Sequence, residues 1–370
     1  MACAAFDGQV ARHDPRVKDL MEKFVGVRIV QANGMDLSLF QFDYDLTFAA
    51  FFLNADRTIY GRYGSRSDSR QTMREMSMEG FRKSLQAALE IHEGYPANRD
   101  SLRGKRGPAS RVASPEKYPS LKKYASTLDL TGQVARSCVH CHMVGAAERK
   151  VLRSSGEPFG DEVLYPWPMP DAVGLELDPR ERATVRSVTP GSAAAKSGFR
   201  RGDEILRLEG QPLVSIADVQ WILHRAGDSA KLAARVRRDG REVELTLSLD
   251  DGWRRGGDIS WRTTTWDLRR MATGGLLLEE LPARDRRQRD LGEERLALRV
   301  EHVGQYGEHA TAKRAGFRKG DIVVEFAGRT GRMTESDLIV YVLQQKKPGA
   351  RIPVTVLRGE KRVDLELPVR

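Results

Sequence analysis

The chain has 370 residues, of which 40% are hydrophobic and 30% charged, and 61 Lys and Arg against 51 Asp and Glu give a net charge of +10. This length is large for one compact domain and predicts two to four domains. No apolar run approaches about twenty residues, which excludes a membrane-spanning helix in this sequence. Three cysteines are too few for a disulfide framework.

The positive charge suggests a nucleic-acid partner, because Lys and Arg patches release counterions from phosphates when they bind. However, the arginines are spread along the chain and alternate with acids, as in residues 284–290 (RDRRQRD). The sequence also lacks a helix-turn-helix, RNP or zinc-finger pattern. We therefore expect a solvated basic surface and no nucleic-acid partner.

The first 95 residues show alternating helix and strand signals. Apolar spacing of about 3.6 residues indicates helices, and β-branched or aromatic runs bounded by turn residues indicate strands. A proline inside the first helix should kink or restart it. The predicted elements are a helix over 9–24, a buried strand over 25–30, a hairpin of 48–53 with 58–63, and an amphipathic helix over 77–92.

This order of elements resembles a thioredoxin-like domain of the branch with Cys-x-x-Cys after its first strand. The resemblance implies that residues 1–95 form such a domain without its first strand, and that Cys3 is the resolving thiol whose partner would precede Met1. Thr47 stands where the family has a cis-proline. Thiol–disulfide exchange needs a second sulfur, so Cys3 alone cannot complete a redox cycle.

Residues 96–168 are expected to form a linker followed by a cytochrome c-like segment. The part up to about 125 is rich in Pro, Ser, Arg and Lys, which is typical of linkers. Cys138, Cys141 and His142 then form C-x-x-C-H, the attachment signature of c-type haem. Two thiols on one helical turn could reach both vinyl groups of a porphyrin, with His142 as the proximal iron ligand. This predicts covalently attached haem c.

Other interpretations of this segment remain open. The segment resembles a small cytochrome c, and Met169 is the candidate for the sixth iron ligand, with Met143 and His140 as weaker candidates. A zinc site is the less favoured alternative, because zinc needs four ligands and no second Cys/His pair lies at ligand spacing. A bare redox dithiol at Cys138 and Cys141 is the third interpretation.

The remainder of the chain is an internal repeat. When the sequence is shifted by 118 residues, 197–205 (SGFRRGDEI) matches 315–323 (AGFRKGDIV). This unit resembles a bacterial-type PDZ domain, which carries G-[FL]-x-x-G-D-x-[IL]. The resemblance places PDZ domains at 169–250 and 273–370, each a small β-barrel or sandwich with two helices. In both copies we expect the second motif glycine to have positive φ and the aspartate to bind local backbone donors.

Each copy begins with a loop that matches the carboxylate-binding loop of PDZ domains. The expected peptide-binding residues are Gly174 and Leu175 in the first copy and Gly275 and Leu276 in the second. The resemblance implies that the domains dock protein C-termini or exposed strands by strand addition. The connector at 251–272 holds three of the five tryptophans beside arginines, and we expect these rings to join the two domains rather than to bind a ligand.

The order of segments resembles a planctomycete-type family of thioredoxin-fold/PDZ proteins, some of which are selenoproteins. The fold class is therefore multidomain α+β. The resemblance suggests a selenocysteine codon, read as a stop, directly before Met1, and a secretion signal upstream of it. The natural protein would then be extracytoplasmic (periplasmic).

The favoured function is an extracytoplasmic thiol or selenol oxidoreductase with covalent haem and tandem PDZ domains, its redox partner unidentified. The alternative is a non-enzymatic PDZ scaffold with a remnant thioredoxin fold, whose C-x-x-C-H binds zinc or nothing. The sequence contains neither G-x-S-x-G nor a metalloprotease helix, so no motif in it indicates a protease.

Overall fold

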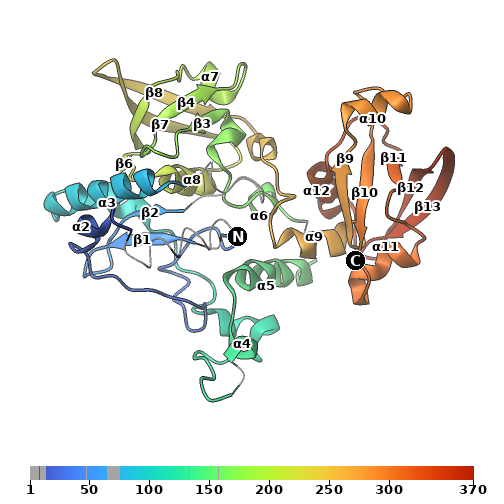
Figure 1. Cartoon of the computed structure of the whole chain (residues 1–370), viewed down its shortest axis with the longest axis horizontal. Helices are drawn as coiled ribbons and strands as arrows, with labels where there is room; N and C mark the ends of the chain where they lie inside the picture. Colours follow the sequence, from blue (N-terminus) through green and yellow to red (C-terminus); the bar gives the residue numbers. More distant parts are fainter. Residues whose placement is uncertain (1–7, 9–13, 47, 65–75, 133, 157) are drawn as a thin grey trace. The chain divides into compact units, whose positions relative to one another are not determined.

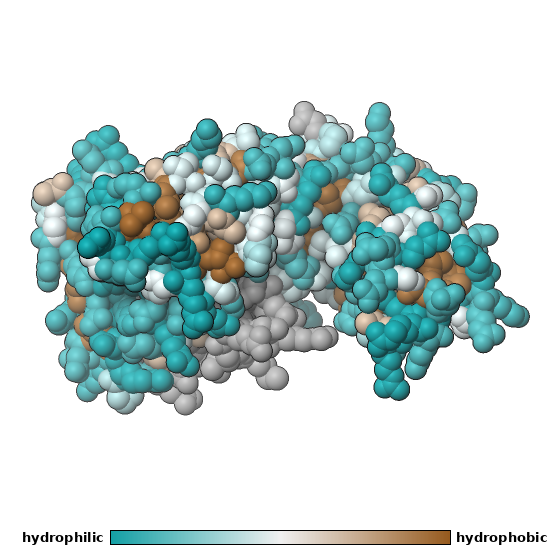
Figure 2. Space-filling model, turned by 90° about the horizontal axis from the view of Figure 1, so that it is seen from above, coloured by the Kyte–Doolittle hydropathy of each residue, from teal (hydrophilic) through white to brown (hydrophobic). Residues whose placement is uncertain are grey.

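The computed structural model describes residues 8, 14–46, 48–64, 76–132, 134–156 and 158–370 (Figure 1). The chain divides into two compact units, one of residues 1–151 with 161–258 and the other of residues 152–160 with 259–370. Among the described helices, none combines the length and the apolar character that a bilayer crossing requires. Figure 2 shows one face of the molecule, which is mainly hydrophilic with small, separate hydrophobic patches.

The hairpin and the long helix near the N-terminus form as predicted. Strands β1 (Ala50–Leu53) and β2 (Ile59–Tyr63) pair antiparallel, and α3 (Met78–Glu93) packs against them. Helix α3 begins where the Ser77 hydroxyl accepts the Gly80 N–H at 2.9 Å, an N-cap that satisfies one free helix donor. Rings from both elements share one core, in which Phe81 contacts Tyr63 and Phe52.

The rest of the predicted thioredoxin-like pattern is not found in the described residues. Residues 25–30 form no strand, and Val25 and Val27 are 95% and 81% exposed. β-Branched residues stabilise a strand only when a neighbouring strand and a core face receive them, and β1 and β2 pair only with each other. Of the helix expected over 9–24, the described part is the four-residue α2 (Lys18–Met21). Cys3 and Thr47 lie outside the described residues.

The segment expected to be a linker is packed against the rest of the first unit. Leu102 and Tyr118 are buried, and Val144 on α5 (Cys141–Ser154) joins a core cluster with Leu37. Prolines start two of its short helices, because their fixed φ suits the first helical position. The elements are η2 (Arg99–Lys105), η3 (Pro115–Lys117), η4 (Pro119–Leu121), α4 (Val134–Ser137), α5 (Cys141–Ser154) and α6 (Asp161–Leu164).

The two repeat copies lie in different units, and each combines β-strands with short and longer helices. In the first unit, β3 pairs with β4, and a second sheet has the order β6-β5-β7-β8. These elements are η5 (Pro170–Val173), β3 (Leu175–Leu177), β4 (Val185–Val188), α7 (Ala193–Lys196), β5 (Glu204–Leu208), β6 (Gln211–Pro212), α8 (Ile216–Arg225), β7 (Ala230–Arg238), β8 (Arg241–Leu249) and η6 (Trp253–Gly256).

In the second unit a single five-stranded sheet has the order β13-β12-β11-β10-β9, so β9 is an edge strand. The elements are α9 (Thr265–Ala272), β9 (Leu276–Glu280), α10 (Ala283–Gln288), β10 (Leu298–Val303), η7 (Gly307–Ala310), α11 (Thr311–Arg314), β11 (Ile322–Phe326), α12 (Glu335–Gln345), β12 (Arg351–Arg358) and β13 (Lys361–Pro368).

The repeated Gly-Asp turn has the predicted geometry in both copies. Gly202 and Gly320 have φ of 90° and 89°, which glycine adopts without strain. Asp203 accepts the Arg200 N–H, and Asp321 accepts the Arg318 N–H, each at 2.9 Å.

Both aspartates also bind an arginine that the sequence pattern did not single out. Arg238 donates two hydrogen bonds to Asp203 at 2.7 Å each, and Arg358 donates two to Asp321 at 2.8 Å each. Each arginine comes from the end of the strand that pairs with the one after the turn, β7 or β12. A bidentate pair with a buried carboxylate fixes the turn against the sheet in each domain.

The tryptophans of the connector lie in different units. Trp253 belongs to the core of the first repeat copy and donates its indole N–H to the Gly227 carbonyl at 3.0 Å. Trp266 lies on α9 in the second unit, with its ring edge-on to His302. Each ring thus contributes to packing within its own unit.

Candidate peptide-binding site

The loop before β9, which holds the predicted peptide contact Gly275, has two glycines with positive φ. Gly274 and Gly275 have φ of 64° and 89°, where side chains are strained. A Cβ on Gly275 would lie 2.1 Å from the His309 carbonyl oxygen, so only glycine fits. The loop leads directly into edge strand β9, with α12 beside it (Figure 1).

A side chain from α12 occupies the free edge of β9. The Leu278 N–H donates to Glu335 Oε1 at 2.8 Å. An edge N–H of this kind is the donor that an added peptide strand would use. The Glu335 carboxylate therefore stands where the carbonyl of a bound peptide would be.

Arg269 on α9 holds Glu335 in this position. Its guanidinium donates to Glu335 Oε2 at 2.5 Å and Oε1 at 3.0 Å, and the side chains are only 2% and 3% exposed. The guanidinium also lies over the Trp266 ring, 4.7 Å from its centroid. A bidentate, stacked arginine of this kind has a fixed geometry that lysine cannot reproduce.

Arg269 reaches the loop as well through its backbone. Its carbonyl oxygen accepts the Gly275 N–H at 3.0 Å. Two donors of the site, on Gly275 and Leu278, are thus satisfied by the chain itself. The last turn of α9 and the first residue of α12 thus contact the loop and the edge of β9 in the second repeat copy.

The first copy has the same loop but lacks this ion pair. Gly174 has φ of 84°, and a Cβ there would lie 2.2 Å from the Ser192 side chain. Its N–H donates to the Asp171 carbonyl at 2.8 Å. Ile216, the first residue of α8, stands at the position of Glu335, so no carboxylate reaches β3 from this position.

Helix α8 of the first copy is covered by neighbouring segments. Its residues from 216 to 223 are all buried. The Trp167 ring stacks on His224 at 4.2 Å, and the Trp167 carbonyl accepts the Gln220 amide at 2.7 Å. The segment before the loop therefore lies against the helix that would form one wall of a peptide groove.

A buried ion pair anchors the other side of α8. Lys105 Nζ lies 2.8 Å from Asp218 Oδ2, and both side chains are fully buried. Burial lowers the pKa of Lys105, and the Asp218 charge opposes that shift. Asp218 also accepts the Val214 N–H at 2.9 Å. The Arg62 guanidinium stacks on Trp221, 4.0 Å from the ring centroid.

The C-x-x-C-H segment does not have the geometry that the haem prediction assumes. Helix α5 begins at Cys141, so Cys138 precedes the helix and the two thiols do not share a helical turn. Both are free thiols, and burial raises the pKa of Cys141, which makes it less reactive. Burial together with the stacked His140 ring lowers the pKa of His142. Met169 packs against the core of the first repeat copy.

Comparison with known proteins identifies the repeat copies. A family model described as "PDZ domain" matches residues 170–249 and 303–369, so the chain contains two PDZ domains. The first PDZ domain is thus the repeat copy of the first unit, and the second PDZ domain that of the second unit.

Several similar curated proteins are named as periplasmic serine proteases. The chain is 25% identical over 187 residues to a "Probable periplasmic serine endoprotease DegP-like" of Marinomonas sp. (strain MWYL1), covering 50% of this chain and 37% of that protein. It is 28% identical over 170 residues to the protein of the same name from Pseudomonas savastanoi, covering 45% and 30%. It is 35% identical over 78 residues to "Periplasmic serine endoprotease DegP" of Escherichia coli K12, covering 21% and 16%. The chain thus spans about a third of the length of the first two relatives.

A similar solved structure is "HtrA-type protease AlgWS227A with decapeptide". It is 16% identical, with 37% of this chain and 40% of that chain covered, and the TM-score is 0.23.

These findings correct the predicted redox function and cofactor. The first matched relatives are named as periplasmic endoproteases, and the similarity comes with PDZ domains rather than with a thioredoxin or cytochrome family. Within the described residues no three His, Cys, Asp or Glu side chains gather in a way that could hold a metal ion. The predictions of a haem-bearing thioredoxin-like oxidoreductase and of zinc at C-x-x-C-H are therefore wrong.

Proposed function

We propose that the chain is a non-enzymatic PDZ adaptor that docks partner peptides through a C-terminal carboxylate or an exposed strand. The names of its relatives support a periplasmic location. The second PDZ domain is the principal docking domain in this proposal. The proposal rests on one observation: the Leu278 N–H on edge strand β9 donates to the Glu335 side chain. A side-chain acceptor, and not a neighbouring strand, satisfies this donor, so a peptide strand could replace it.

Binding would exchange internal acceptors for acceptors of the peptide. A peptide carbonyl replaces Glu335 at the Leu278 N–H, and the terminal carboxylate replaces the Arg269 carbonyl at the Gly275 N–H. The Arg269–Glu335 pair can stay formed during this exchange, so no buried charge loses its partner. Because each new hydrogen bond replaces an existing one, we expect the native chain to bind such peptides weakly.

The first PDZ domain has a different role in this proposal. Gly174 and Leu175 remain its predicted peptide contacts. Since residues 216 to 223 of α8 are all buried, this domain mainly serves as the surface on which the N-terminal segment folds.

A double variant tests the proposed role of the second PDZ domain. Arg269→Met with Glu335→Ile removes both charges and places at 335 the residue that the first domain has at the matching position. Apolar replacement of a buried ion pair commonly keeps or increases stability. We expect a peptide with a free C-terminal carboxylate to bind this variant at least about tenfold more tightly than the native chain. The same peptide with an amidated C-terminus should show no gain.

The matched control removes an exposed ion pair at the opposite edge of the same sheet. Arg351 and Glu366 lie 3.2 Å apart on β12 and β13, far from β9 in strand order. Arg351→Met with Glu366→Ile should leave peptide binding unchanged. Absence of carboxylate-dependent binding in every variant would overturn the proposal. Degradation of casein by the pure chain, blocked by a serine-directed inhibitor, would overturn its non-enzymatic part.

A further inference from the structure

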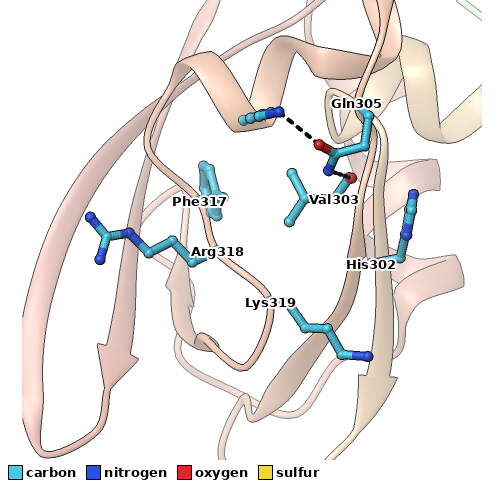
Figure 3. Close-up of a pocket in the computed structure, with 7 residues that line it drawn as sticks. His302, Val303, Gln305, Phe317, Arg318 and Lys319 are labelled. Carbon is cyan, nitrogen blue, oxygen red and sulfur yellow. Dashed lines mark hydrogen bonds between the residues drawn. The ribbon is translucent and has the colours of Figure 1, made fainter.

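The second PDZ domain has a pocket separate from its peptide groove. The pocket has a volume of about 220 Å³ and lies between the end of β10 and the loop that joins α11 to β11 (Figure 3). Val303 and Phe317 are the buried, apolar members of its lining. Neither Gly275 nor Leu278 lines it, so a ligand there would not compete for the donors of the groove.

The rim of this pocket is positively charged. Lys313, Arg318 and Lys319 line it, and no carboxylate does. Within the described part of the chain, the side chains of Arg318 and Lys319 form no ion pair. Lys313 donates to the Gln305 amide oxygen at 2.7 Å, a neutral partner that leaves its charge uncompensated. Three neighbouring cations without acidic partners repel one another, so an anionic ligand would be stabilised here.

The directions of the side chains limit the kind of anion that fits. Figure 3 shows the Arg318 and Lys319 side chains extending to different sides of the pocket, with Gln305 at its upper end. Lys313 reaches the pocket through its hydrogen bond to Gln305. A single small anion could not contact all three cationic groups at once. An extended chain with several negative groups could do so, while one apolar side chain enters between Val303 and Phe317.

We propose that this pocket binds an acidic peptide segment, in which an apolar residue enters the pocket and flanking Asp or Glu residues pair with Lys313, Arg318 and Lys319. A nucleic-acid backbone fits less well, because it needs a continuous positive track. Glu301 on β10 and Glu308 in η7 interrupt such a track close to the pocket in sequence. The proposal does not depend on whether the groove at β9 binds peptides.

The first PDZ domain provides a natural comparison. In the repeat alignment Arg200 and Arg201 match Arg318 and Lys319, whereas Ala195 stands at the position of Lys313. Lys313→Ala therefore reproduces the first domain at that position. Charge reversal of the first domain's pair, Arg200→Glu with Arg201→Glu, is the matched control for Arg318→Glu with Lys319→Glu.

The test uses fluorescence anisotropy of the full chain with a labelled peptide that has a central leucine between glutamates. Its C-terminus is amidated, so it lacks the carboxylate that the groove would need. We expect Arg318→Glu with Lys319→Glu to weaken binding by about tenfold or more, Lys313→Ala to weaken it by about threefold, and the control pair to change it little. Raising salt from about 50 to about 200 mM should weaken binding to the native chain.

Three outcomes would overturn the proposal. One is equal affinity of the native chain and the Arg318→Glu, Lys319→Glu variant, with both shown to be folded by thermal unfolding. Another is equal loss in the control pair, which would indicate a general charge effect. The third is tighter binding of a single-stranded oligonucleotide of matched charge, which would assign the surface to nucleic acid.

Discussion

Arg269 and Glu335 form a buried ion pair with hydrogen bonds of 2.5 and 3.0 Å, and the same Glu335 carboxylate accepts the Leu278 N–H of edge strand β9. Three elements therefore meet at one carboxylate: the end of α9, the start of α12 and the strand that would receive a peptide. A buried charge that loses its partner is strongly unfavourable, so the pair stabilises the second unit while Glu335 occupies the Leu278 N–H on β9.

Single substitutions of this pair should destabilise the second unit. We expect Arg269→Ala to reduce its free energy of unfolding by about 3–5 kcal/mol, because Glu335 would remain buried and charged. The double variant Arg269→Met with Glu335→Ile should lose much less free energy of unfolding, because it leaves no unpaired buried charge. Denaturant unfolding followed by the fluorescence of Trp266 and Trp261 measures both. Equal losses in the single and double variants would contradict the ion-pair account.

The Lys105–Asp218 pair predicts a difference between the two repeat copies. Asp218→Ala should cost about 3–5 kcal/mol of stability, because it leaves Lys105 buried without its counter-charge. Asp337, its exposed counterpart in α12, only completes a capping box with Thr334. Asp337→Ala should therefore cost about 1 kcal/mol. Thermal unfolding of the two variants side by side measures the difference. Similar losses of stability would contradict a stabilising role of the buried Lys105–Asp218 pair.

Asp56 predicts a titration at unusually low pH. Hydrogen bonds from the Tyr95 hydroxyl and then from Thr58 lower the pKa of Asp56 from 3.8 to about 2. A lowered carboxyl pKa stabilises the fold above the unfolded value of 3.8, and this contribution is lost as the pH falls towards about 2.

An NMR titration of the Asp56 carboxyl carbon measures this pKa. The midpoint should lie near 2 in the native chain and move towards 3.8 in Tyr95→Phe. A native midpoint at 3.8, or no change in Tyr95→Phe, would show that the hydrogen bond to Tyr95 is absent in solution.

The exposed segment at 25–30 predicts tolerance to polar substitution. Val27→Thr should change stability by less than about 0.5 kcal/mol, because Val27 is largely exposed. Phe52→Ala, in the core between β1 and α3, should cost about 3–5 kcal/mol. Denaturant unfolding gives both values. A large loss of stability in Val27→Thr would show that this segment is buried, as the sequence predicts.

The sequence could predict the features that depend on residues close together in the chain. The hairpin at β1 and β2, helix α3 and the Gly-Asp turns follow from periodicity, turn residues and the positive φ of glycine. The PDZ assignment succeeds because the motif around Gly202 and Asp203 recurs at Gly320 and Asp321. In these places local chemistry alone determines the backbone.

The features that failed depend either on partners distant in sequence or on the residue at which a helix begins. The β-branched run at 25–30 predicts a strand only if another strand pairs with it, and the described sheet offers none. Cys138 and Cys141 have haem-like spacing, but the start of α5 at Cys141 separates them in structure. Lys105 lies in a segment with linker composition, and its burial becomes visible only once Asp218 is placed beside it.

Of the candidate site, the sequence predicts the loop but not the ion pair beside it. The PDZ resemblance implies the loop glycines Gly174 and Gly275, which have positive φ, and their contact with a peptide remains a prediction. Arg269 and Glu335 were not identified, because an arginine on a connector and a glutamate at a helix start are common on solvated surfaces. The position of Glu335 at the start of α12, where Ile216 stands in α8, was the available signal.

The most direct test of the adaptor account is an NMR titration of the full-length Arg269→Met, Glu335→Ile variant. The amide resonances of Gly275 and Leu278 are followed while a peptide with a free C-terminal carboxylate is added. The account predicts that both amides shift and saturate together, and that the amidated peptide leaves Gly275 unchanged. Unchanged resonances at saturating peptide, or equal shifts with the amidated peptide, would contradict it.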